Sequence, residues 1–141
     1  MLKPECSNDT DINIKSSYVD VIKSISDEKS VSIFKLIADT NSNGEINLKK
    51  SGLTSKQYHS RVSQMKATGL IKRKSGKYYL SSLGKVIYCC MMISQSAINN
   101  YYKLKAIDSS KDFDLSAEEF RKLVDALIDN QKIKEFLINQ C

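Results

Sequence analysis

The hydrophobic period changes abruptly at Gly69, and this change constrains the fold more than any other feature of the sequence. Before Gly69, one apolar helix face is formed by Tyr58, Val62 and Met65. After it, the segments LIKRK and KYYL alternate around a Ser-Gly dipeptide, which is the pattern of two strands joined by a tight turn. The sequence therefore predicts a helix over 54–68, ended by Gly69, and a β-hairpin over 70–80.

The rest of the chain is expected to be mostly helical, because Pro occurs once and Gly only five times in 141 residues. Helical spacing predicts helices over 16–25 and 26–40, one long helix over about 82–106, and a helical tail. A lone strand is expected at 46–48. The first half of the long helix is apolar on all sides, so two of its sides require cover.

Charge is distributed very unevenly. Residues 46–107 carry twelve Lys or Arg and no Asp or Glu, whereas 1–45 and 108–141 each carry five basic and eight acidic residues. A positive field confined to the middle of the chain favours a polyanionic partner. The alternative is an ordinary solvated lysine face, but such faces usually alternate with Glu.

Several classes of function are disfavoured by composition. One His and the absence of acids between 46 and 107 leave no general acid–base pair or catalytic triad in the basic segment, so no enzyme is expected. The four Cys have no zinc-like spacing, and no metal or cofactor is expected. No secretory signal is visible, and the longest apolar run, 86–93, is too short for a membrane span, so we expect a cytoplasmic protein with reduced thiols.

The segment LTSKQYHSRVSQMKATGLIKRKSGKYYLSSLGKVIY resembles archaeal winged helix-turn-helix transcriptional regulators of the broad MarR/ArsR-like group. The resemblance covers about residues 26–107. It is carried by Leu53, Tyr58, Val62, Met65, Gly69, Leu70, Gly76, Tyr78, Leu80 and Gly84. It implies a winged helix-turn-helix that binds double-stranded DNA, usually as a homodimer joined through terminal helices.

Four parts are expected on this basis. They are an N-terminal tail and leading helix (1–25), the winged helix-turn-helix module (26–81), a long helix for core and dimerisation (82–107) and an acidic helical tail (108–141). The homodimer is expected to form through 82–107, with 113–139 as a second candidate segment. No membrane partner is expected.

The helix over 54–68 is expected in the major groove, where side chains read base edges, and the wing over 70–80 on the backbone or in the minor groove. The expected DNA-binding residues are Thr54, Ser55, Lys56, Gln57, His59, Ser60, Arg61, Gln64, Lys72, Arg73, Lys74, Lys77 and Tyr79. The lysines of the wing could instead serve only to prevent pairing between sheet edges.

Three alternatives remain open at this stage. The module could bind an acidic protein within the transcription machinery instead of DNA. Cys89 and Cys90 could sense thiol oxidants or a metal, although the simpler interpretation is that the CCMM run packs in the core and a dimer seam. His59 could act as a pH switch, although a lone His on a polar helix face is more often inert.

Overall fold

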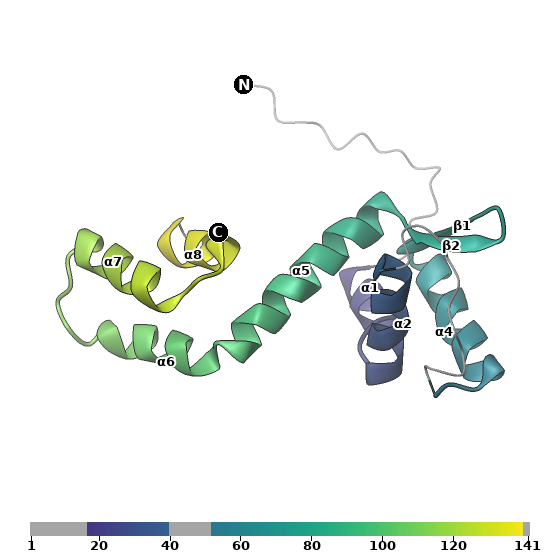
Figure 1. The fold of residues 1–141 in the computed structure, drawn as a ribbon, viewed down its shortest axis with the longest axis horizontal. Coiled ribbons are helices and arrows are strands. Elements are labelled where there is room, and N and C mark those ends of the chain that lie inside the picture. Colours follow the sequence, from purple (N-terminus) through teal and green to yellow (C-terminus); the bar gives the residue numbers. More distant parts are fainter. Residues whose placement is uncertain (1–16, 40–51, 140–141) are drawn as a thin grey trace, which may run out of the picture. The chain divides into compact units, whose positions relative to one another are not determined.

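The computed structural model describes residues 17–39 and 52–139, and the chain divides into two compact units, residues 1–88 and 89–141 (Figure 1). The described part is mostly helical and contains one two-stranded antiparallel sheet, as the sequence predicted. The strand expected at 46–48, together with Cys6 and Cys141, lies outside the described residues. Each unit is considered by itself below.

The described part of the first unit packs three helices, a hairpin and the start of a further helix around an apolar core. Its described elements are α1 (Tyr18–Lys23), α2 (Glu28–Asp39), α4 (Ser55–Ala67), β1 (Ile71–Lys74), β2 (Lys77–Leu80) and the start of α5 (Ser82–Asn99). The most deeply buried side chains are Ile33, Phe34, Ile37, Val62, Met65 and Leu70. The ring of Tyr88 on α5 meets Phe34 edge-on, with 5.9 Å between ring centroids, so α5 begins against this core.

Helix α4 has clear start and stop signals. The Thr54 hydroxyl accepts a hydrogen bond from the Gln57 N–H at 3.2 Å, and the Gln57 side chain accepts one from the Thr54 N–H at 3.2 Å. This reciprocal capping box satisfies two backbone donors at the helix start. The chain leaves the helix through Gly69, whose φ of 80° suits glycine best. The predicted bounds of this helix are therefore confirmed.

The hairpin forms where the period-two pattern predicted it. Its cross-strand pairs are Ile71–Leu80, Lys72–Tyr79, Arg73–Tyr78 and Lys74–Lys77. Ser75 and Gly76 both have positive φ, 53° and 77°, which is the geometry of a two-residue turn that matches the twist of the strands. The two side chains of a cross-strand pair point to the same side of the sheet, and successive pairs point to opposite sides. Ile71–Leu80 and Arg73–Tyr78 therefore share one face, and Lys72–Tyr79 and Lys74–Lys77 share the other.

The end of the hairpin is attached directly to the start of α5. The Ser81 N–H donates to the Leu70 carbonyl at 3.0 Å, and its hydroxyl accepts from the Gly84 N–H at 2.9 Å. Gly84 lies so close to the Leu70 carbonyl that a Cβ atom there would come within 2.0 Å of the oxygen. Only glycine therefore permits this contact between backbones.

The second unit is helical and has its own core. It contains the remainder of α5, α6 (Tyr101–Ser110), α7 (Ala117–Leu127) and α8 (Gln131–Asn139). Its buried residues are Ile107, Val124, Ile128 and Ile133, with Ile93, Ala97, Leu104 and Phe120 among the side chains packed against them. At the start of α7, the Ser116 hydroxyl accepts a hydrogen bond from the Glu119 N–H at 3.1 Å and caps the helix.

The single long helix expected over 82–107 is wrong, because it is interrupted at Asn100. This residue leaves the helical conformation (φ −101°, ψ 21°), and its side-chain amide donates to the Ser96 carbonyl at 2.8 Å. Its N–H is shared between the carbonyls of Ser96 and Ala97, at 3.1 Å each. Asparagine competes with the helix for backbone hydrogen bonds, and this competition accounts for the division into α5 and α6.

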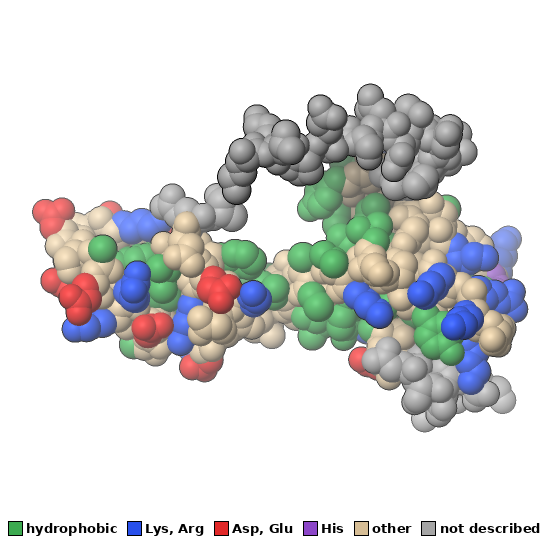
Figure 2. Space-filling view, turned by 90° about the horizontal axis from the view of Figure 1, so that it is seen from above, with side chains coloured by type: hydrophobic (Ala, Val, Ile, Leu, Met, Phe, Trp, Pro, Cys, Tyr) green, Lys and Arg blue, Asp and Glu red, His purple; other side chains and the backbone are tan. Residues whose placement is uncertain are grey.

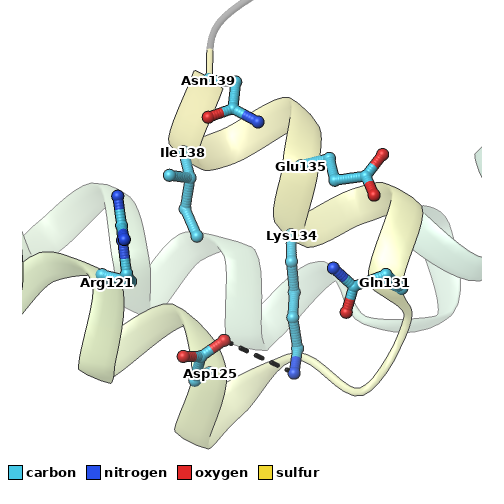
Figure 3. A pocket seen from close by; sticks show the side chains of 7 residues that line it. All are labelled: Arg121, Asp125, Gln131, Lys134, Glu135, Ile138 and Asn139. Atoms are coloured by element: carbon cyan, nitrogen blue, oxygen red, sulfur yellow. Dashed lines mark ion pairs between the residues drawn. The ribbon is translucent and has the colours of Figure 1, made fainter.

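An ion pair fastens α8 to α7. Figure 3 shows the Lys134 side chain directed toward Asp125, with 3.5 Å between nitrogen and oxygen. These two residues line a polar hollow of about 290 Å³ that also includes Arg121 and Gln131. Within the hollow, the Lys134–Asp125 pair connects the two helices.

Candidate nucleic-acid interface

Two of the expected base-reading residues on α4 are engaged within the protein. The side chain of Gln57 is held by the capping box with Thr54. Arg61 donates from both Nε and Nη2 to one carboxylate oxygen of Asp27, at 3.2 and 2.7 Å. Its side chain is 23% exposed, against 48% for Asp27. Arg61 therefore fixes α4 against the start of α2, whereas Gln57 completes the cap of α4 itself.

Asp27 is the residue that sequence reasoning missed. Its other oxygen accepts from the Ser30 N–H at 3.1 Å, which caps the start of α2. Hydrogen bonding from Ser30, followed by that from Arg61, lowers the pKa of Asp27 from 3.8 to about 2. The capping position was visible in the sequence, but the partner on α4 is 34 residues away and no local pattern indicates it.

The solvent-facing side of α4 remains polar and uncovered. Lys56, Ser60 and Gln64 follow one another at four-residue steps and are all exposed. Ser55 and His59 are also exposed, and the His59 ring contacts Tyr58 edge-on at 5.3 Å between centroids. This face therefore presents polar side chains and one cation to solvent, where they could reach base edges in a groove of DNA.

The hairpin divides the expected wing residues between its two faces. One face carries the pairs Lys72–Tyr79 and Lys74–Lys77, so three lysines surround one tyrosine. Lys72 and Lys74 are exposed, and Lys77 and Tyr79 are half-buried. Figure 2 shows Lys and Arg side chains gathered on the right, in the region of the hairpin and α4. This lysine face is a compact source of positive charge.

Arg73 belongs to the opposite face of the hairpin, together with the buried pair Ile71–Leu80. Its guanidinium carbon lies 5.8 Å from the centre of the Tyr78 ring, a cation–π geometry. Burial, and secondarily the nearby Tyr78, raises the pKa of the Tyr58 hydroxyl. Arg73 therefore does not share the environment of the three lysines.

Among the described residues of the first unit, two exposed cations of the acid-free segment 46–107 were not among the expected contacts. Lys66 lies in the last turn of α4, and Lys85 lies in the first turns of α5. Neither forms an ion pair with any carboxylate in the described ranges 17–39 and 52–139. The absence of Asp and Glu from residues 46–107 is the sequence signal that could have identified these two lysines as candidate contacts.

The cysteine pair is not a core element. Cys89 and Cys90 are exposed thiols, so the expectation that they pack in the core of the chain is wrong. The cause is that the first half of α5 leaves part of its apolar surface uncovered, including Leu83 and Val86. Within the described residues, no three His, Cys, Asp or Glu side chains are placed to hold a metal ion.

None of the described helices combines the length and apolar character that crossing a membrane requires. No protein-family model, curated protein or solved structure matches this chain.

Proposed function

We propose that this chain is a sequence-specific transcriptional regulator that binds double-stranded DNA through a winged helix-turn-helix module. In this proposal α4 enters the major groove and the β1–β2 hairpin contacts the backbone or the adjacent minor groove. The observation that carries the proposal is the coincidence of an uncovered polar helix face with a lysine-rich hairpin face in one unit. Both faces lie in a tract without a single acid.

In this proposal the two elements have different tasks. Lys56, Ser60 and Gln64 have side chains suited to base edges, since a Gln amide can pair with adenine and a Lys with guanine. Lys72, Lys74 and Lys77 are suited to phosphates, which carry no sequence information but fix the position of the protein. Arg61 pairs with Asp27 and Gln57 caps α4, so we expect Arg61 to affect binding through the orientation of α4 and Gln57 through the stability of its first turn.

A salt titration of duplex binding tests the proposal. We expect the logarithm of affinity to fall steeply with the logarithm of salt concentration, because each phosphate contact releases about 0.9 of a counterion. Removing the three wing lysines together should lower that slope by about 2 to 3 and weaken all sequences alike. Lys122→Ala combined with Lys132→Ala, which removes exposed cations from the second unit, is the control.

Selection of bound duplexes from a random pool tests sequence specificity. A common motif among the selected duplexes would support the proposal. Affinity that does not change with salt, or a pool that yields no motif, would contradict it. The first of these outcomes would favour a module that binds protein within the transcription machinery.

A further inference from the structure

The start of α6 presents two aromatic rings and two cations to solvent. Tyr101 is 58% exposed and Tyr102 is 82% exposed. Lys103 and Lys105, which follow them, are exposed as well. Figure 1 shows α7 and α8 on one side of α6, where the core of the second unit lies. We refer to the four exposed side chains, Tyr101, Tyr102, Lys103 and Lys105, as the α6 patch.

The two rings of the patch are open to a flat ligand. They meet edge-on, with 5.4 Å between ring centroids and 68° between ring planes. An edge-on pair covers at most one ring face and leaves the other faces in solvent. Lys105 follows Tyr101 by four residues and Tyr102 by three, so it neighbours both rings on the helix surface. A cation therefore lies next to each stacking surface.

The lysines of the patch differ from most other lysines of the second unit, because they have no carboxylate partner. Four others each lie within 4.0 Å of an Asp or Glu in the same unit, namely Lys111, Lys122, Lys132 and Lys134. Among residues 17–39 and 52–139, Lys103 and Lys105 have no such partner. Asp108, one turn beyond Lys105, pairs with Lys111. The positive charge of the patch therefore remains available to an anion from outside the unit.

We propose that the α6 patch binds single-stranded nucleic acid, with one base stacked on Tyr102, another on Tyr101, and the adjoining phosphates held by Lys103 and Lys105. An unpaired strand combines a polyanionic backbone with bases whose faces are free, and exposed rings beside unpaired cations match both properties. The bases of a duplex are already stacked on one another and offer no free face. This activity is separate from duplex binding by α4 and the hairpin and does not depend on it.

The two kinds of contact predict different dependences of affinity. Each stacked base should contribute about fivefold or more, with little sensitivity to salt. Each lysine–phosphate contact with a single strand should add about 0.7 to the slope of log affinity against log salt. Because the patch offers only two lysines, we expect weak binding, with a dissociation constant on the order of 10 µM at physiological salt.

Fluorescence anisotropy of the full chain with labelled strands of about 12 nucleotides tests the inference. All measurements use a chain that also carries Lys72→Ala, Lys74→Ala and Lys77→Ala, so that the hairpin does not compete for the strand. Oligothymidine or oligouridine should bind at least about fivefold tighter than an abasic strand of equal length, which has phosphates but no bases. Tyr102→Ser should reduce this difference, whereas Tyr102→Phe should preserve it. Tyr18→Ser, at a comparably exposed ring on α1, is the control.

A second readout uses the absence of Trp from the chain. Tyr102→Trp introduces one indole, whose fluorescence a stacked base quenches. Oligothymidine should quench it, and the abasic strand should not. Tyr18→Trp, the matched control on α1, should be quenched by neither strand.

A salt titration tests the lysines of the patch. Lys103→Gln combined with Lys105→Gln should lower the salt slope for oligothymidine by about 1.4, which corresponds to two phosphate contacts. Lys122→Gln combined with Lys132→Gln removes two exposed cations elsewhere in the same unit and should leave the slope unchanged. An equal decrease in both double variants would contradict phosphate binding at the patch.

Three further results would overturn the inference. They are equal affinity for base-bearing and abasic strands, equal losses in Tyr102→Ser and Tyr18→Ser, and indole fluorescence at position 102 that oligothymidine does not change. The first would show a surface for anions in general, which vesicles of anionic lipid would also bind. None of these results concerns binding of duplex by α4 and the hairpin, so the proposed function would stand.

Discussion

The guanidinium of Arg61 and the carboxylate of Asp27 meet at 2.7 Å and thereby join the middle of α4 to the start of α2. One carboxylate thus serves as a helix cap and as an ion-pair partner. The orientation of the proposed recognition helix depends on this contact between the acidic and the basic parts of the sequence.

This contact predicts a dependence of stability on pH. The pKa of Asp27 is depressed to about 2 from 3.8, so its contribution is complete above about pH 4 and disappears as pH falls toward 2. Because Asp27 is half exposed, we expect only about 0.5–1 kcal/mol from the pair. Asp27→Asn keeps a capping side chain but removes the charge, and should lose about this amount at neutral pH.

Urea unfolding followed by circular dichroism measures the effect. The difference in free energy of unfolding between the wild type and Asp27→Asn should shrink between pH 4 and pH 2. Arg61→Gln should behave in the same way, and the two changes together should cost less than their sum. A difference that stays constant over this pH range would argue against the pair.

Gly84→Ala should destabilise the first unit, although alanine is normally the better helix former. The added methyl group would clash with the Leu70 carbonyl oxygen, which belongs to the backbone and cannot move aside as a flexible side chain could. We expect a loss of about 3 kcal/mol in the free energy of unfolding. As a control, Asn99→Ala at an exposed position of the same helix should leave the free energy of unfolding unchanged or raise it slightly. If Gly84→Ala also left it unchanged, the close packing of Gly84 on Leu70 would be contradicted.

The turn of the hairpin should respond differently at its two positions. Gly76→Ala places a side chain at φ 77° and should cost about 1 kcal/mol, even though no atom within 4 Å obstructs it. Ser75→Asn should be neutral or gain a few tenths of a kcal/mol, because Asn tolerates positive φ. Thermal unfolding of both variants provides the comparison, and equal Tm values would show that the turn tolerates either change.

Gln64 and the wing lysines should have separable effects on DNA binding. Gln64→Ala should reduce discrimination between the selected duplex and its single-base variants by about 1–3 kcal/mol at one position, with little change in salt slope. Lys74→Ala should weaken every duplex similarly and lower the slope by about 1. Fluorescence anisotropy with a panel of duplexes measures both, and the same pattern in the two variants would contradict the division of tasks.

Much of the first unit could be predicted because its signals are local. The start of α4 at Thr54, its end at Gly69 and the Ser-Gly turn each depend on residues within one turn of chain. The Arg61–Asp27 pair could not be predicted in the same way, because its members are 34 residues apart. Sequence reasoning therefore identified the face of α4 but not the fact that two of its side chains are engaged within the protein.

The second unit was predicted less well, for two physical reasons. A helical hydrophobic pattern runs through Asn100 without interruption and gives no sign that α5 ends there. The helix ends because the Asn100 side chain competes for a backbone hydrogen bond, by donating to the Ser96 carbonyl. The apolar surface around Cys89 and Cys90 was expected to be buried, but both thiols are exposed. Hydrophobic periodicity indicates which side chains of a helix are apolar, but it does not indicate which element packs against them.

The close approach of Gly84 to the Leu70 carbonyl has a mechanical consequence. No side chain separates the hairpin from the first turn of α5, and Ser81 adds a hydrogen bond on each side of the junction. A tilt of the hairpin must therefore rotate the start of that helix by a similar amount, because there is no compressible layer in which the displacement could be absorbed.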